Sequence, residues 1–173
     1  MNVTKKLVDE HKNILKVADA LIKKAEECEK GKADKKFFEE AVFFIRNYAD
    51  KFHHAKEEDI LFKAICTPEA EMHCNPVEQM LHEHELGRSF VKEMEEGARE
   101  VDAKKIGENA RKYACLIREH IFKEDNILYP MCEEGLSEKA KKEMIKAFEM
   151  ADEKAKDTES KCLNIARRLA KNE

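Results

Sequence analysis

Two ten-residue segments of the chain share a pattern that could bind metal ions. Residues 53–62 and residues 120–129 both read His-x-x-Lys-Glu-acid-x-Ile-Leu-aromatic. In each copy a glutamate follows the histidine by four positions, as Glu57 follows His53 and Glu124 follows His120. On an α-helix this step brings two side chains onto one face, one turn apart. An imidazole and a carboxylate so placed can bind one metal ion, and two such helices facing each other can hold two.

Histidines elsewhere in the chain extend this pattern. Capping residues, Pro, Gly and apolar periodicity predict five helices, over residues 4–30, 34–66, 76–99, 102–129 and 137 to near the end. Each of the first four carries a histidine, because His11 lies on the first and His84 on the third. In an antiparallel bundle, residues near the start of one helix lie level with residues deep along its neighbours. The sequence therefore predicts that these side chains meet at one level.

The expected fold class is all-α, an antiparallel up-down four-helix bundle with an additional C-terminal helix. Short connections between long helices favour this topology. We expect the bundle to span residues 1–133. Residues 134–173 are expected to form a helical extension that packs on the bundle or on a partner subunit, where it would allow a homodimer. The apolar side of this C-terminal helix predicts that it is buried against another protein surface.

The composition fits a compact helical protein. The chain has 173 residues, 40% of them charged, with only five Gly and three Pro. A net charge of −4, with Lys and Glu interspersed, argues against a surface for nucleic acid. No apolar run reaches the roughly 18–20 residues of a membrane span, and the N-terminus does not resemble a signal peptide. We therefore expect a cytoplasmic protein that binds neither nucleic acid nor membranes.

The six cysteines form no C-x-x-C pair and are interpreted as reduced thiols. Cys66 and Cys74, which flank a Pro-containing loop, could instead form a redox pair or bind a soft metal.

For the histidine-rich set, imidazoles and carboxylates favour a first-row transition metal over magnesium or calcium. The two glutamates could bridge two ions a few ångströms apart. This donor set indicates two iron ions, oxo- or hydroxo-bridged when oxidised, ahead of manganese or zinc.

These segments resemble the hemerythrin-like (HHE cation-binding) domain family over roughly residues 1–133. The matching segments are Glu10-His11, His53-x-x-Lys56-Glu57-Glu58, Met80-Leu81-x-Glu83-His84-x-x-Gly87-Arg88 and His120-x-x-Lys123-Glu124-Asp125. A member of this wider family is a known four-helix bundle. The expectation of a four-helix bundle for this chain therefore rests partly on the resemblance. The resemblance implies six metal ligands: His11, His53, Glu57, His84, His120 and Glu124.

The chain departs from the oxygen-carrying members at two places. Those carriers have a fifth histidine one turn from the ligand on the third helix, where this chain has Met80 and Arg88. They also place the last carboxylate five residues after its histidine, which would be Asp125 here. The helical step of four favours Glu124 and keeps Asp125 in reserve. Both departures lean away from a dedicated reversible oxygen carrier.

Neighbouring residues are assigned lesser roles. His54 and Glu58 have the same spacing as the main pair but are rotated by about 100°, so we expect them to face outward or to lie behind the ligands. His82 is expected on the surface. Tyr129 could approach the site as a hydrogen-bond donor, but ordinary core packing is the favoured expectation. An apolar wall around the metals is expected from aromatic and aliphatic neighbours: Phe52, Phe62, Ile121 and Phe122.

The function these features imply is that of a non-haem di-iron protein. It would bind dioxygen, nitric oxide or peroxide at open iron positions, as a sensor, a scavenger or a reductase. Reduction would need an electron-donor protein, because the chain has no rubredoxin-like cysteine cluster. The alternatives are an iron-binding module for storage, donation or iron sensing without catalysis, and a structural bundle whose histidines are incidental.

Overall fold

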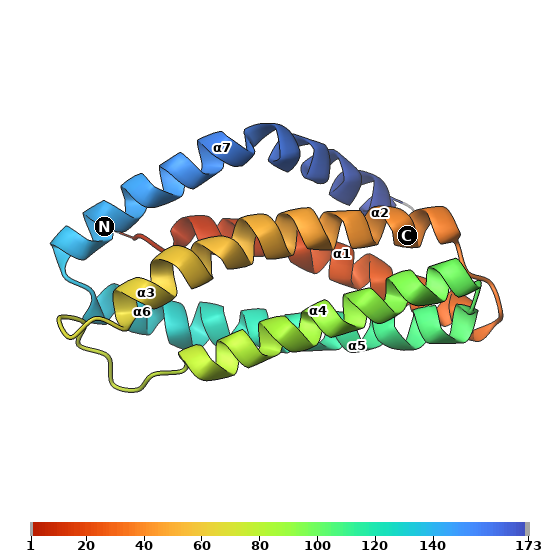
Figure 1. The fold of residues 1–173 in the computed structure, drawn as a ribbon, viewed down its shortest axis with the longest axis horizontal. Helices are drawn as coiled ribbons and strands as arrows, with labels where there is room; N and C mark the ends of the chain where they lie inside the picture. Colours follow the sequence, from red (N-terminus) through yellow and green to blue (C-terminus); the bar gives the residue numbers. More distant parts are fainter. Residues whose placement is uncertain (1, 172–173) are drawn as a thin grey trace.

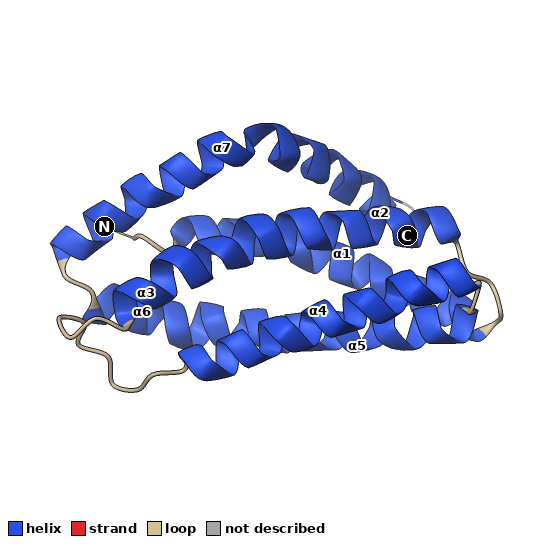
Figure 2. Cartoon of the chain, in the orientation of Figure 1, coloured by secondary structure: helices blue, strands red, loops and turns tan. Residues whose placement is uncertain are grey.

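The computed structural model describes residues 2–171, and these form five helical rods without any strand (Figures 1 and 2). The first rod is α1 (Lys5–Glu29) and the third is α4 (Val77–Glu100). The second is continuous and consists of α2 (Lys35–Phe44), η1 (Ile45–His54), η2 (Glu57–Leu61) and α3 (Phe62–Ile65). The fourth consists of α5 (Ala103–Lys123), η3 (Glu124–Leu128) and α6 (Tyr129–Gly135), and the fifth is α7 (Glu138–Lys171). The segments labelled η are π-helical.

The first four rods form an antiparallel bundle, and α7 arches over one side of it (Figure 1). In the bundle α1 and α4 both pack along α5, and α2 packs against α4. The C-terminal α7 contacts α1, α2 and η1 of its own chain. The predicted fold class is confirmed, while the division into two units at residue 133 stays a prediction. Among the described helices, none combines the length and the apolar character of a membrane span.

Local signals in the sequence explain the ends of the rods. Asp34 and Asp102 each accept a hydrogen bond at 3.0 Å from a backbone N–H three residues later, as helix N-caps do. Gly31 follows α1 with φ +75°, a conformation that glycine adopts without steric cost. Pro130 lies in the first turn of α6, where its missing N–H is tolerated, so the fourth rod continues to Gly135.

The apolar core is divided into two clusters by a polar layer. The larger cluster includes Ile14, Phe44 and Ile117, and the smaller one includes Leu7 and Leu128. On every rod of the bundle, the predicted ligands lie between residues of one cluster and residues of the other. Apolar packing on both sides therefore fixes the height of this polar layer within the bundle.

Candidate metal centre

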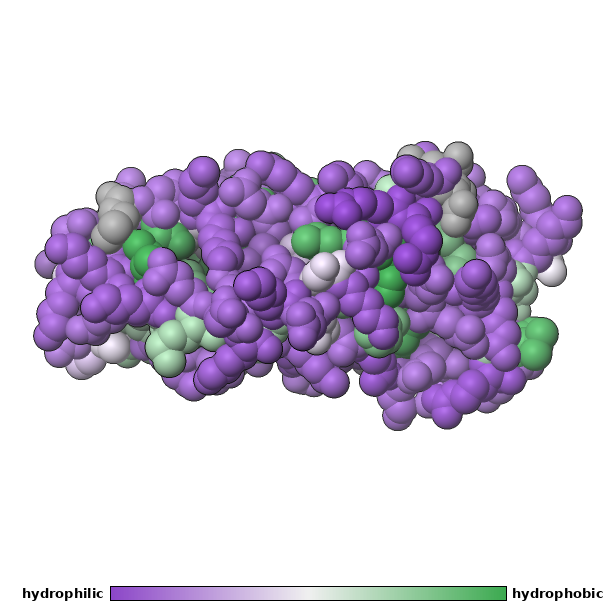
Figure 3. Space-filling model, turned by 90° about the horizontal axis from the view of Figure 1, so that it is seen from above, coloured by the Kyte–Doolittle hydropathy of each residue, from purple (hydrophilic) through white to green (hydrophobic). Residues whose placement is uncertain are grey.

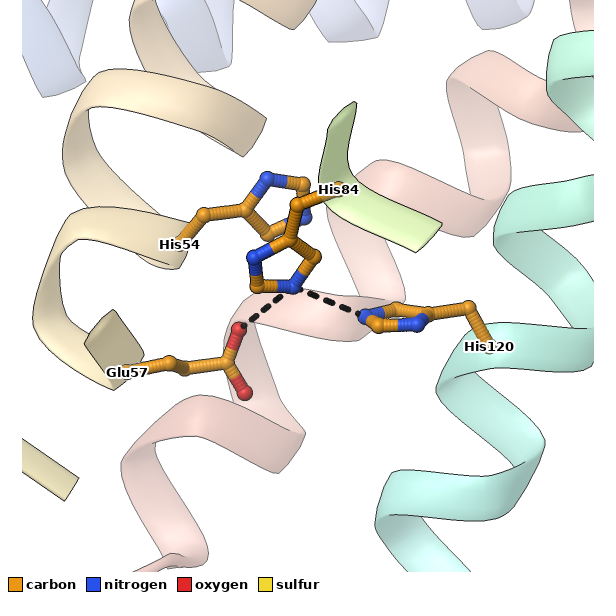
Figure 4. Close-up of side chains that lie close together, drawn as sticks. All are labelled: His54, Glu57, His84 and His120. Carbon is orange, nitrogen blue, oxygen red and sulfur yellow. Dashed lines mark hydrogen bonds and ion pairs between the residues drawn. The ribbon is translucent and has the colours of Figure 1, made fainter. Parts of the chain in front are cut away.

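All six predicted ligands point into the polar layer and are almost completely buried. Their relative exposures are 2% or less: His11, His53, Glu57, His84, His120 and Glu124. The potential ligand atoms form two groups, and within each group all of them lie within 4.8 Å of one another. One group consists of His11, His53 and Glu124, and the other of His54, Glu57, His84 and His120. Figure 4 shows the second group. The structure thus brings the predicted residues together, and their binding of metal stays a prediction.

The imidazoles form two pairs whose Nε2 atoms face each other. The Nε2 atoms of His11 and His53 are 2.9 Å apart, and those of His84 and His120 are 3.0 Å apart. Two ligands at about 2.1 Å from one ion, and about 90° apart, would be separated by about 3 Å. Each pair therefore has the spacing of two neighbouring ligands of one metal ion.

Each inner carboxylate reaches one histidine of each pair. Glu57 Oε2 lies 3.6 Å from Nε2 of both His53 and His84. Glu124 places Oε2 3.2 Å from Nε2 of His11 and Oε1 3.1 Å from Nε2 of His120. Both glutamates therefore lie between the two imidazole pairs, the position of a carboxylate that bridges two ions.

The outer nitrogens of the four histidines contact carboxylates. His53 Nδ1 lies 2.9 Å from Glu10 and His120 Nδ1 2.8 Å from Glu83. The other two contacts, at 2.8 and 2.7 Å, are His11 Nδ1 with Asp125 and His84 Nδ1 with Glu58. Donation from each Nδ1–H leaves the lone pair of Nε2 directed into the layer, the tautomer that a metal needs.

Sequence reasoning found only part of this outer set, since a place behind the ligands was among the expectations for Glu58 alone. A signal for the other three carboxylates was present. Each outer carboxylate is the sequence neighbour of an inner ligand and contacts a histidine on a different rod, as Glu10, next to His11, contacts His53. Neighbouring residues on a helix point about 100° apart, so one faces the layer and the other an adjacent rod. Asp125, kept in reserve as a ligand, takes this outer position. Buried Lys56 and half-buried Lys123 in turn pair with Glu10 and Glu83.

The inner carboxylates are buried without adequate partners. Glu57 Oε2 and both oxygens of Glu124 have no hydrogen-bond partner. Burial and the adjacent Glu124 raise the pKa of Glu57 well above its usual range. Burial opposes ionisation of Glu124 as well, but His120 and His11 lower its pKa. Buried carboxylate oxygens that face imidazole lone pairs fit a bound cation, which would satisfy both.

The histidines also respond to this environment. Burial and the neighbouring His11 lower the pKa of His53 well below its usual range. For His120, burial is outweighed by Glu124 and Glu83, which raise its pKa to about 9. Binding of metal by His120 would therefore displace a proton, whereas His53 is already neutral.

One expectation about neighbouring residues is wrong, and two others are narrowed to one of their alternatives. His54 does not take the outward position, because it is only 6% exposed and its ring stacks on His84 with centroids 3.8 Å apart (Figure 4). Tyr129 takes the less favoured of its two expected roles, since its hydroxyl donates a hydrogen bond to Glu57 Oε1 at 2.6 Å. Phe122 is 63% exposed and is no part of an apolar wall. Phe52, Phe62 and Ile121 are buried as expected, and His82 is exposed.

A cavity of about 280 Å³ reaches the pair formed by His84 and His120. Its lining also includes His54, Gly87 and Tyr113, and several apolar side chains. Arg88 lies on its wall, where Asp50 Oδ1 and Glu58 Oε1 accept hydrogen bonds from its guanidinium group at 2.8 and 2.7 Å. The cavity could admit a small ligand to this side of the polar layer.

Comparison with known proteins agrees with this geometry. The family model described as the hemerythrin HHE cation-binding domain matches residues 2–132, which include all six predicted ligands. Searches of curated proteins and of solved structures gave no match. The match spans most of the chain and ends before α7 begins. The chain therefore belongs to the hemerythrin HHE cation-binding domain family.

Proposed function

We propose that this chain is a non-haem di-iron protein that binds dioxygen, nitric oxide or peroxide, as a sensor, a scavenger or a reductase. The observation that carries the proposal is the placement of two carboxylates between two imidazole pairs. His11 and His53 would hold one ion, His84 and His120 the other, and Glu57 and Glu124 would contact both. Ferrous ions bound here would supply open coordination positions and electrons to the small ligand.

The chain's own residues would control what reaches the ions. Apolar clusters on both sides exclude bulk water from the layer. The cavity beside His84 and His120 offers a route for a small molecule. Tyr129 holds Glu57 through its hydroxyl hydrogen bond, so one carboxylate is fixed before any ion binds. A reductase would also need an electron-donor protein, and the expected cytoplasmic location and the homodimer remain part of this proposal.

Anaerobic reconstitution with ferrous iron tests the proposal. We expect two irons per chain by elemental analysis, and near-ultraviolet bands of oxidised di-iron when dioxygen is added in a stopped-flow instrument. Retention of fewer than two irons per chain would contradict the di-iron assignment. Two bound irons without any spectral response to dioxygen, nitric oxide or peroxide would contradict the ligand-binding role.

The second candidate is an iron-binding module for storage, donation or sensing without catalysis. It is favoured by the burial of the unpartnered oxygens of Glu57 and Glu124 in the centre of the bundle. Folding would then depend on the metal, which suits a protein that reports iron by its stability. Ready loss of iron to a weak chelator, with no reaction toward small ligands, would support this candidate over the first.

A further inference from the structure

His54 lies on the inner side of the second rod, beside the imidazole pair of His84 and His120. A ligand atom of His54 is within 4.8 Å of ligand atoms of Glu57, His84 and His120. Its ring is nearly parallel to that of His84, with an interplanar angle of 10°. Figure 4 shows the His54 ring directly over the His84 ring. His54 therefore belongs to the polar layer by position.

Both ring nitrogens of His54 lack a hydrogen-bond partner. The nearest carboxylate is Asp50, whose Oδ1 lies 3.7 Å from Nδ1, beyond hydrogen-bonding distance. The four predicted ligand histidines differ in this respect, since each has a carboxylate at Nδ1. An imidazole that is 6% exposed and has no partner is unusual in a folded protein, and it indicates an interaction with a group outside the chain.

The repeated segment provides an internal comparison. Ile121 follows His120 in the second copy, as His54 follows His53 in the first. Ile121 is also buried, with 3% exposure. The bundle can therefore fill this position with an aliphatic side chain, so packing alone does not require the imidazole of His54.

We propose that His54 is a seventh metal ligand and binds the ion held by His84 and His120. This inference rests on the proposed di-iron centre and deepens it. The two ions would then differ, because one would have three imidazoles and the other, bound by His11 and His53, would have two. The hydroxyl of Tyr129, 3.4 Å from His11 Nε2, lies on the side of the ion with two imidazoles. The two similar halves of the chain would thus surround the two ions differently.

The test is a metal titration of His54→Ile, which introduces the residue found at the corresponding position of the other half. Anaerobic cobalt(II) is titrated into the metal-free full-length chain, and bound metal is followed by equilibrium dialysis and visible absorption. For native protein we expect two bound cobalt ions. For His54→Ile we expect at least a tenfold weaker affinity at one site, with the other site and its absorption unchanged. His82→Ala removes an exposed imidazole from α4 and should leave both affinities as in the native chain.

Two results would overturn the inference while leaving the di-iron centre intact. Unchanged affinities in His54→Ile would show that His54 binds no metal. Equal weakening at both sites would show that it acts through packing. By contrast, native protein that binds fewer than two ions would refute the proposed centre itself. A second measurement needs no variant: anomalous diffraction from cobalt-loaded native crystals should place an ion about 2.1 Å from a His54 nitrogen, and a separation beyond bonding distance would overturn the inference.

Discussion

At the scale of residues, the centre is built twice from the same set of contacts. Glu10 contacts His53 as Glu83 contacts His120, and each of these glutamates precedes a predicted ligand of its own rod. Two of the differences between the two halves place a polar group near the predicted ligands in one half only. His54 corresponds to Ile121, and Phe62 corresponds to Tyr129. Two similar half-sites thereby acquire different surroundings, which a pair of ions with different roles would require.

Glu10→Gln is expected to weaken metal binding selectively. The amide is a poorer acceptor for His53 Nδ1–H and removes the negative charge that raises the basicity of the imidazole. Loss of such an outer partner typically lowers metal affinity by about 10–100-fold, and here the site formed by His11 and His53 should be affected. Metal titration followed by elemental analysis measures the change. Glu119→Gln, on the exposed face of α5, serves as the control, and equal affinities in both variants would contradict the prediction.

The meeting of the six predicted ligands in one layer could be expected from the sequence, because their spacing repeats and their depths match. The outer carboxylates could have been found by the same reasoning, since each adjoins a ligand. The contact between His54 and His84 could not, because it depends on how the second and third rods pack together, which the pattern of one rod does not determine. His54 ends η1, and Glu57 and Glu124 each begin a π-helical segment.

At the scale of helical elements, π-helical turns occur in both copies of the repeated segment, over Glu57–Leu61 and Glu124–Leu128. Such turns are uncommon and often accompany functional sites. Their recurrence at equivalent residues links them to the placement of the two inner carboxylates. The connection between α4 and α5 has a different irregularity. Val101, 82% exposed, adopts the left-handed conformation with φ 59°.

Val101→Gly is expected to stabilise the protein. A left-handed conformation costs a β-branched residue about 1–2 kcal/mol, and the extra flexibility of glycine in the unfolded chain offsets about half of that gain. We expect the free energy of unfolding to rise by about 0.5–1 kcal/mol in urea titrations. Val101→Ala keeps the conformational cost while removing the exposed methyl groups, so it should leave stability almost unchanged. Equal gains in both variants would point to the side chain instead of the backbone.

The C-terminal α7 is connected to the centre by a chain of polar contacts. Asp152 of α7 accepts a hydrogen bond from Lys56 Nζ at 3.0 Å. Lys56 is 2% exposed, lies over the ring of Phe52 and also pairs with Glu10, which contacts His53. A helix outside the family match therefore supports one histidine of the centre through two intervening side chains.

Asp152→Asn is expected to destabilise the bundle. It removes the negative charge next to a buried ammonium group, which should lower the free energy of unfolding by about 1–3 kcal/mol. Urea unfolding of the metal-free protein, followed by circular dichroism, measures this loss. Glu149→Gln changes an exposed carboxylate on the same helix and should have little effect. A stability equal to that of the native chain would show that Lys56 is satisfied by Glu10 alone.

At the scale of the whole molecule, the polar layer divides the apolar core of the described bundle into two clusters. Figure 3 shows that the face carrying α7 is mostly hydrophilic, with apolar residues in separate small patches. This face offers no continuous apolar surface for a second subunit, and dimerisation through α7 stays a prediction. The stability of the bundle must therefore come from its own core, in which several polar atoms have no hydrogen-bond partner.

Metal removal should accordingly lower the stability of the whole bundle, because the ligands come from all four rods. Free iron at a thousand times the dissociation constant would stabilise the folded state by about 4 kcal/mol for each of the two sites, about 8 kcal/mol together, which corresponds to about 16–32 °C in melting temperature for a chain of this length. Anaerobic thermal melts with and without ferrous iron measure the difference. The double variant His53→Ala, His120→Ala removes one imidazole from each pair and should abolish the iron-dependent shift. His73→Ala, which changes an exposed histidine in the loop before α4, should retain it. Identical melts of the native chain with and without iron would mean that the polar layer does not bind the metal, and the buried carboxylates would then need another partner.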